Sequence, residues 1–113
     1  MKPPTFAPVY LSLFPHLAKI ANEHGYALAA HGSVVRDMDL VAVPWTDEAD
    51  EPSMLMSSLA DYLKLYDDIW GTGIDGPTKK PHGRVSYKLY TGFGSAIDLS
   101  VMPRAQDYKS RLP

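Results

Sequence analysis

Three aspartates in this chain of 113 residues fall where carboxylates could act together. Asp37 and Asp39 are two positions apart at an apolar stretch, so in a β-strand both side chains leave the same face. Asp98 lies inside a second apolar stretch, where an unpaired carboxylate is costly to bury. Carboxylates that converge from neighbouring strands would bind Mg²⁺ or Mn²⁺, hard cations that prefer oxygen ligands. The chemistry expected of such a site is metal-assisted displacement at a phosphate.

Two of these aspartates, Asp37 and Asp98, also have a simpler interpretation. The role of Asp37 could be limited to closing a turn, and that of Asp98 to forming an ion pair with Arg84 or Lys88. The combination of an Asp-x-Asp pair with a mid-strand aspartate about 60 residues later favours the metal site. We therefore predict that Asp37, Asp39 and Asp98 are the catalytic and metal-binding residues.

A Gly32-Ser33 pair lies between the first apolar strand candidate and the Asp-x-Asp segment. In a turn, its backbone N–H groups and its hydroxyl can face an anion. Arg36 lies between this pair and the aspartates, and its guanidinium matches the geometry of phosphate oxygens. Lys88 would help to offset the phosphate charge. We expect these four residues, Gly32, Ser33, Arg36 and Lys88, to bind a nucleotide.

Taken together, these motifs resemble those of the nucleotidyltransferase superfamily with the polymerase-beta-like fold. The likeness is carried by His31-Gly32-Ser33, Asp37-Met38-Asp39-Leu40 and Ile97-Asp98-Leu99. The chain is similar to small, often phage-encoded, minimal nucleotidyltransferase-like proteins. The resemblance implies that the Gly-Ser turn holds a triphosphate and that the three carboxylates bind two divalent ions. It also implies transfer of a nucleotidyl group from an NTP to a hydroxyl of a protein or RNA.

Two alternatives remain open at this point. The string Gly32-Ser33-Val34-Val35-Arg36-Asp37 also resembles the Gly-Gly-x-Val-Arg-Asp start of tRNA nucleotidyltransferases, in which the aspartate caps a helix. The second alternative is a non-catalytic binding module, such as an antitoxin-like or host-interaction protein of a phage or mobile element. The short spacer between Ser33 and Asp37, and the lack of a C-terminal helical domain in this sequence, favour that module.

Hydrophobic spacing predicts the elements that would position these residues. We expect an α+β fold, a short mixed sheet flanked by helices, in a minimal nucleotidyltransferase-like arrangement. Residues 1–103 would form a single domain and 104–113 a polar, frayed tail. The expected elements are a helix over 7–24 broken or kinked at Pro15, strands over 26–30 and 38–43, a helix over 52–66, a long loop over 71–83, and strands over 84–90 and 96–102.

Composition limits the partners that we expect. A net charge of −2 does not support a general electrostatic grip on double-stranded DNA or on an anionic membrane. No apolar run approaches the roughly 20 residues that span a bilayer. The absence of cysteine excludes thiolate metal sites, and Ser33 lacks the glycine pattern of a nucleophile elbow. We expect a cytoplasmic protein without a membrane partner, for which a homodimer is a candidate assembly.

Overall fold

The computed structural model describes residues 6–32, 34, 36–65, 72–92 and 94–109, which form one mixed β-sheet and three α-helices. The strand order is β1-β2-β5-β4-β3, with β2 and β5 parallel and the other neighbours antiparallel. The predicted α+β class with a mixed sheet is confirmed. The elements are α1 (Ala7–Glu23), β1 (Tyr26–His31), β2 (Asp37–Pro44), α2 (Pro52–Leu63), β3 (Thr72–Lys79), a 3₁₀ turn (Pro81–Gly83), β4 (Val85–Gly92), β5 (Ser95–Val101) and α3 (Ala105–Lys109).

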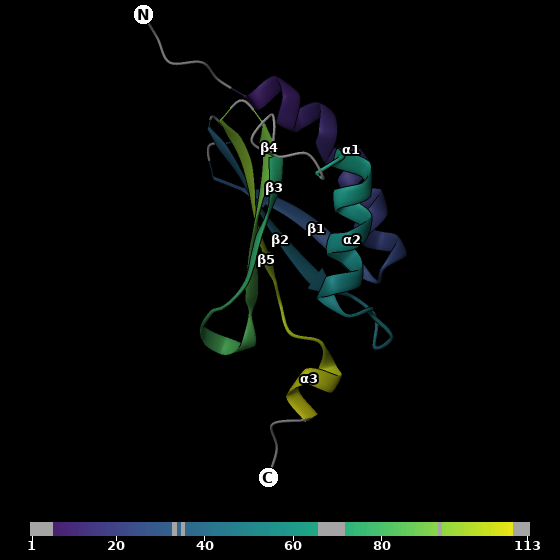
Figure 1. Cartoon of the computed structure of the whole chain (residues 1–113). Helices are drawn as coiled ribbons and strands as arrows, with labels where there is room; N and C mark the ends of the chain where they lie inside the picture. The colour runs from purple at the N-terminus through teal and green to yellow at the C-terminus, as the bar shows by residue number, and fades with distance from the viewer. Residues whose placement is uncertain (1–5, 33, 35, 66–71, 93, 110–113) are drawn as a thin grey trace, which may run out of the picture.

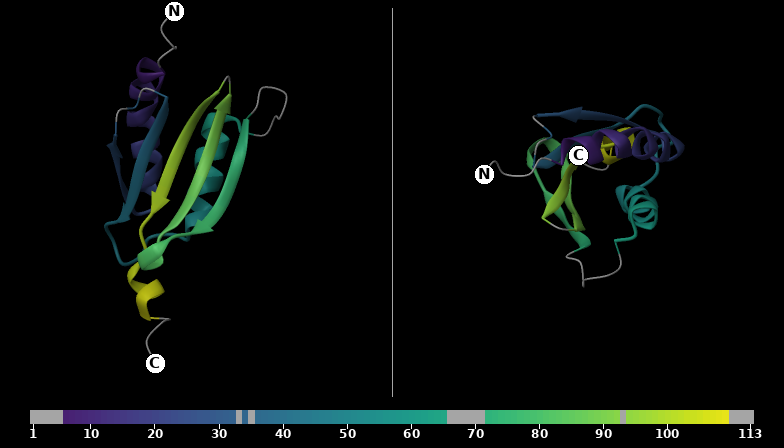
Figure 2. Two further views of the ribbon diagram at one scale, coloured as in Figure 1. Left: turned by 90° about the vertical axis from the view of Figure 1, so that its left-hand side faces the viewer. Right: turned by 90° about the horizontal axis from the view of Figure 1, so that it is seen from above.

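Helices α1 and α2 lie against the same face of the curved sheet, and no helix formed by the described residues covers the other face (Figures 1 and 2). Side chains that alternate along β2 and β5 point into the layer between sheet and helices. Six of them are buried: Met38, Leu40, Ala42, Ile97, Leu99 and Val101. Because side chains of a strand alternate between faces, their neighbours Asp37, Asp39 and Asp98 lie on the open face.

Helix α1 runs through Pro15 as a single helix, so the predicted alternative of a break into two helices is wrong, and the alternative of a kink stays a prediction. Pro15 lies on the exposed side, whereas Tyr10, Leu17 and Ala21 are buried against the sheet and hold the helix on both sides of the proline. Gly25 follows the helix in a left-handed conformation, with a φ of +87°. A Cβ atom at that position would stand 2.8 Å from the Cα of Ala49, so only glycine fits.

Residues 72–79 form the edge strand β3, and the prediction of a long loop over 71–83 is therefore wrong. Strand β3 pairs with β4, with a register shift between Asp75 and Thr78. At Gly76 a Cβ atom would stand 2.7 Å from the Ser86 carbonyl oxygen, so glycine permits the close approach of the two backbones. The pairing of β3 with β4 depends on backbone groups, and such a pairing cannot be predicted from the spacing of apolar side chains.

The predicted tail is partly ordered, because residues 105–109 form the short helix α3. Arg104 precedes this helix, pairs with Asp107 at 3.0 Å and donates a hydrogen bond to the Ala49 carbonyl at 3.4 Å. Helix α2 ends at Leu63, where Lys64 adopts a left-handed conformation, while the predicted final residue Tyr66 lies outside the described residues. None of the helices formed by the described residues has both the length and the apolar character needed to span a bilayer.

Candidate functional site

Asp39 and Asp98 are directly opposed on neighbouring strands. The parallel pairing of β2 with β5 places them at the same register position, and Asp37 pairs one step earlier with Ala96. All three aspartates occupy the open face, on adjacent strands in the middle of the sheet. The structure therefore brings together the three carboxylate-bearing positions that the sequence singled out.

A row of polar residues crosses the entire sheet through this point. The register of the five strands aligns one residue from each strand on the open face, which makes a band with carboxylates at its centre. The row contains His31, Asp39, Asp98, Lys88 and Asp75. Lys88 is the cross-strand neighbour of Asp98, so a cation and two carboxylates meet on three adjacent strands.

The environment of Asp98 disfavours its charged form. Burial is the main reason that the pKa of Asp98 lies above its ordinary value, although nearby Lys88 lowers it. The negative charges of Asp37 and Asp39, and a hydrogen bond that a protonated Asp98 makes with Asp39, raise the pKa further. A cation near these carboxylates would relieve the repulsion between them.

Gly32 lies against the Asp39 carboxylate. Its φ is +82°, and a Cβ atom at this position would stand 3.1 Å from Asp39 Oδ2. The left-handed backbone conformation and the close approach of the Asp39 carboxylate both favour glycine at this position. The turn predicted to hold phosphates is thus in contact with one of the predicted metal ligands, although its second residue, Ser33, lies outside the described residues.

Asp37 pairs with Lys88, whose Nζ lies 3.7 Å from Asp37 Oδ2. The two side chains are 38% and 39% exposed. An ion pair that is this accessible to solvent contributes less than about 1 kcal/mol to the stability of the fold. Lys88 also lies 5.7 Å from the centre of the Tyr90 ring. Lys88 is therefore a weakly bound counter-charge among the three carboxylates. Its ammonium group could move to another anion at little cost in stability.

The other predicted phosphate ligand, Arg36, is exposed and precedes β2. Asp37 is the first residue of that strand, and the described residues Val34 and Arg36 are not helical. Asp37 therefore does not cap a helix, and the alignment with the tRNA nucleotidyltransferase start is wrong in this respect. Its position at the beginning of β2 is that of the first aspartate in an Asp-x-Asp strand.

Tyr10 fastens the two aspartate-bearing strands to α1. The buried hydroxyl donates a hydrogen bond to the Arg36 carbonyl and accepts one from the Ala96 N–H at 3.0 Å. These two backbone groups lie immediately before Asp37 and two residues before Asp98. Burial raises the pKa of Tyr10, and the negative charges of Asp37 and Asp98 contribute to the rise. No sequence pattern identifies this tyrosine, because these two bonded groups are 26 and 86 residues away along the chain.

The donor set fits a hard divalent cation, because three carboxylates from adjacent strands offer only oxygen ligands and repel one another. In the arrangement described, no three His, Asp or Glu side chains among the described residues are close enough together to enclose a metal ion. Asp37 is paired with Lys88 instead. Asp39 and Asp98, together with Asp37 after it leaves Lys88, are the residues that would hold such a cation.

A second cluster joins His24, Asp50 and Ser58, which sequence reasoning missed. The Nδ1 atom of His24 lies 2.8 Å from Asp50 Oδ2, and its Nε2 atom lies 2.8 Å from Ser58 Oγ. This is the order of groups in serine hydrolases, whose catalysis also requires free N–H donors for an oxyanion. Ser58 lies in the middle of α2, where backbone N–H groups are engaged in the helix. We therefore assign a structural role to the cluster, which connects the end of α1, the loop between β2 and α2, and α2 itself.

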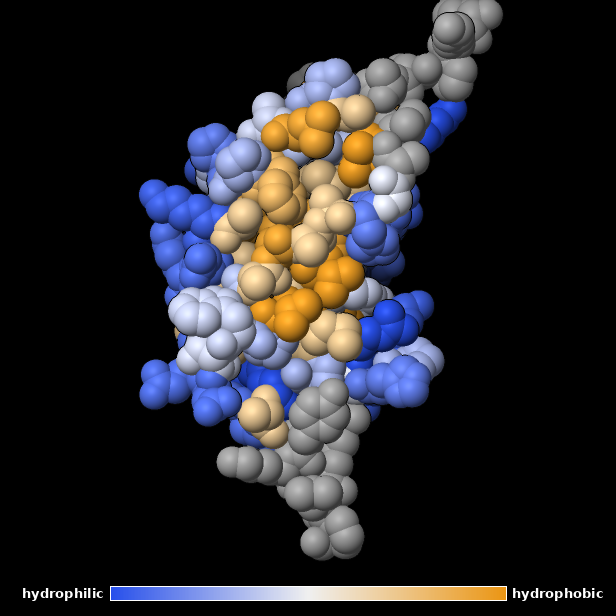
Figure 3. Space-filling view, turned by 180° about the vertical axis from the view of Figure 1, so that it is seen from behind, coloured by the Kyte–Doolittle hydropathy of each residue, from blue (hydrophilic) through white to orange (hydrophobic). Residues whose placement is uncertain are grey.

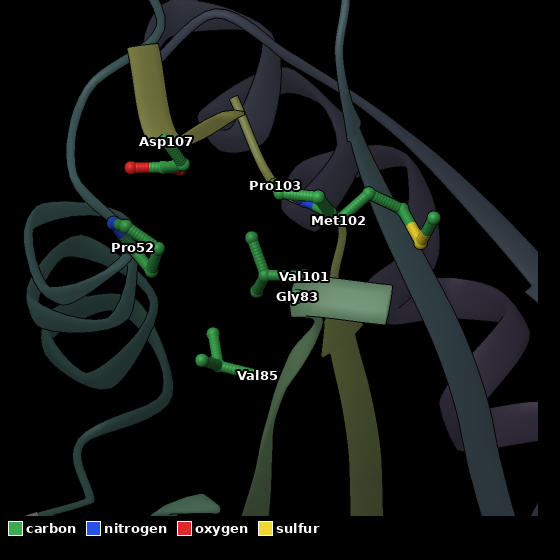
Figure 4. A pocket seen from close by; sticks show the side chains of 7 residues that line it. All are labelled: Pro52, Gly83, Val85, Val101, Met102, Pro103 and Asp107. Carbon is green, nitrogen blue, oxygen red and sulfur yellow. The ribbon is translucent and has the colours of Figure 1, made fainter. Parts of the chain in front are cut away.

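A cavity among the described residues lies away from the three aspartates Asp37, Asp39 and Asp98. It measures about 240 Å³ and lies between the start of α2, the start of β4 and the end of β5 (Figure 4). Its walls include the side chains of Val85 and Val101, which belong to the helix-covered face of the sheet. The carboxylate of Asp107 at its rim is paired with Arg104. This cavity offers no group that the proposed chemistry requires.

Comparisons with known proteins identify no relative, so a function for this chain has to be argued from its site residues. No family model, no curated protein and no solved structure matches the chain.

Proposed function

We propose that this protein is a minimal nucleotidyltransferase-like enzyme that moves a nucleotidyl group from an NTP to a hydroxyl of a protein or RNA. The observation that carries the proposal is the pairing of Asp39 with Asp98 at one register position, beside the Gly32 turn. The short distance between a phosphate-binding turn and a carboxylate pair suits a triphosphate whose charge is neutralised by a cation.

Each of the predicted site residues would have its own role. Asp37, Asp39 and Asp98 would hold Mg²⁺ or Mn²⁺, which would neutralise the phosphates and stabilise charge on the attacking and leaving oxygens. The Gly32 and Ser33 backbone would bind the outer phosphates. Arg36, with Lys88 after it leaves Asp37, would offset the remaining negative charge.

In this reaction the acceptor oxygen attacks the α-phosphorus, the bond from that phosphorus to the bridging oxygen breaks, and pyrophosphate leaves. The proton of the acceptor hydroxyl must be taken up during the attack. A carboxylate of the site would accept that proton. We place the reaction in the cytoplasm, where NTPs and Mg²⁺ are available.

The proposal is tested by incubating the protein with Mg²⁺ or Mn²⁺, α-labelled NTPs, and protein and RNA acceptors. We expect label in the macromolecular fraction and release of pyrophosphate, both lost in Asp39→Asn. The matched control is Asp61→Asn, which changes an exposed aspartate on α2. Equal labelling by wild type and Asp39→Asn would contradict the assignment of the site.

One observation favours the alternative of a non-catalytic binding module. Lys88 lies against Asp37 and provides an internal counter-charge, so the carboxylates could serve the fold alone. In that case a complex with a protein partner would survive replacement of Asp37, Asp39 and Asp98 by asparagine, and no NTP would bind. Nucleotide binding that requires Asp39 distinguishes the enzyme from this alternative.

A further inference from the structure

Among the residues that the structure describes, strand β1 is an open edge of the sheet. It is the outermost strand beside β2, and Figure 2 (left) places α1 behind it rather than beside it. Its sequence, Tyr26 to His31, has no Asp, Glu, Lys, Arg, Pro or Gly. Edge strands of this kind expose backbone hydrogen-bonding groups, and native proteins usually protect them with charges, prolines or bulges.

The opposite edge of the same sheet carries those protections. Strand β3 contains Pro77, a register shift between Asp75 and Thr78, and the charges of Asp75 and Lys79. The contrast between the two edges indicates that β1 is kept suitable for pairing, whereas β3 is not.

The direction of the backbone groups on β1 follows from its pairing with β2. The Trp45 N–H donates a hydrogen bond to the Gly25 carbonyl at 3.0 Å, one position before the ladder begins. Bonded and non-bonded pairs alternate in an antiparallel ladder, so every second residue of β1 is bonded to β2. The remaining residues turn their N–H and C=O groups toward the open edge: Tyr26, Leu28 and Ala30. Pro44, which has no N–H, lies opposite Tyr26 as this alternation requires.

We propose that β1 pairs with β1 of a second copy of this chain in an antiparallel, two-fold symmetric arrangement. With Leu28 opposite itself and Tyr26 opposite Ala30, the outward groups of the two strands form about six hydrogen bonds. An identical strand suits this edge because no charged side chain of β1 meets a like charge in the pairing. The side chains beside the join are small, since Ala27 and Ala29 meet across it on the open face.

The pairing also extends an apolar surface that the single copy leaves exposed. The view from behind has a continuous apolar area along the middle of the molecule (Figure 3). The register places Ala27 and Ala29 of β1 beside Val43 and Val41 of β2 on the open face, and Val43 is 44% exposed. In the dimer these residues would form the apolar centre of one continuous sheet. The three site aspartates of each copy would lie on either side of that centre.

The proposal is tested by sedimentation velocity and light scattering over a concentration series of the full chain. We expect a concentration-dependent dimer in the wild type. Ala30→Pro removes an outward N–H without touching the bonds to β2, and Ala29→Lys places a charge at the join. Both variants should be monomeric with unchanged circular dichroism. Thr78→Lys, on the other edge, is the matched control and should leave the dimer intact.

Amide exchange provides a second measurement if one variant fails to fold. The N–H groups of Leu28 and Ala30 should be protected in the wild type, and the Leu28 N–H should exchange quickly in whichever folded variant is monomeric. A wild type that stays monomeric at every concentration would overturn the proposal. So would a dimer that persists in both folded variants, because the interface would then lie elsewhere.

Discussion

Gly32 and Asp39 are packed so closely that any side chain on Gly32 would press on the carboxylate. A Cβ atom would stand 3.1 Å from Asp39 Oδ2, on a backbone whose φ is +82°. The contact connects the turn predicted to bind phosphates with the aspartate that lies opposite Asp98.

Replacing Gly32 by alanine tests that connection. We expect Gly32→Ala to destabilise the fold by about 1 kcal/mol because of the left-handed φ. It should also weaken Mg²⁺-NTP binding, because the new methyl group displaces the carboxylate. Gly94→Ala is the matched control: its φ is +84°, but nothing lies within 4 Å of the added Cβ. Thermal unfolding and nucleotide titration of both variants should give similar losses of stability, with weaker binding in Gly32→Ala alone.

Tyr10→Phe removes a buried hydroxyl that bonds to backbone groups beside Asp37 and Asp98. The unpaired Ala96 N–H should cost about 1–3 kcal/mol of folding free energy. Tyr26→Phe is the control, because the Tyr26 hydroxyl is equally buried but donates to the Asp50 carbonyl, away from the aspartates. Urea unfolding should report destabilisation in both variants, and nucleotide binding should fall further in Tyr10→Phe. Equal binding in the two variants would argue against a positioning role for Tyr10.

The pH dependence of stability should carry the signature of Asp98. Its pKa is raised by burial and by the neighbouring aspartates, so the folded protein binds this proton more tightly than the unfolded chain. The resulting stability is complete below the ordinary pKa of 3.8 and is lost as pH rises through the folded value. Asp98→Asn should therefore remove this part of the pH dependence and raise Tm at neutral pH. A lower Tm in Asp98→Asn at pH 7 would mean that the carboxylate is paired more favourably than described.

The predictable parts of the molecule are those with a local signal. The apolar runs over 38–43 and 96–102 were sufficient to place Asp39 and Asp98 on strands, and apolar periodicity located α1 and α2. Strand β3 was missed because its glycines and Pro77 are typical of loops, whereas its pairing with β4 depends on the backbone. The pairing of Asp39 with Asp98 depends on which strands become neighbours, and an amino-acid pattern alone does not fix that order.

The hydrogen-bonded cluster at His24 had no such signal, because its members are 26 and 34 residues apart. His24→Ala removes both bonds and should cost about 1–3 kcal/mol, since Asp50 and Ser58 lose a common partner. Ser58→Ala removes one bond and should cost less. Reaction with a serine-directed phosphonate should be absent in the wild type if the cluster is structural. Labelling of Ser58 that depends on His24 would instead make this cluster a second reactive site.

The most direct test of the carboxylate site is a thermal-shift titration with Mg²⁺ and each of ATP, GTP, CTP and UTP, for wild type, Asp39→Ala and Asp61→Asn. A ligand at a hundred times its Kd adds about 2.7 kcal/mol to the stability of the folded state. For a domain of this size we therefore expect Tm to rise by several degrees in wild type and Asp61→Asn, but not in Asp39→Ala. The absence of a Mg²⁺-dependent rise with every nucleotide, or an equal rise in Asp39→Ala, would contradict the account.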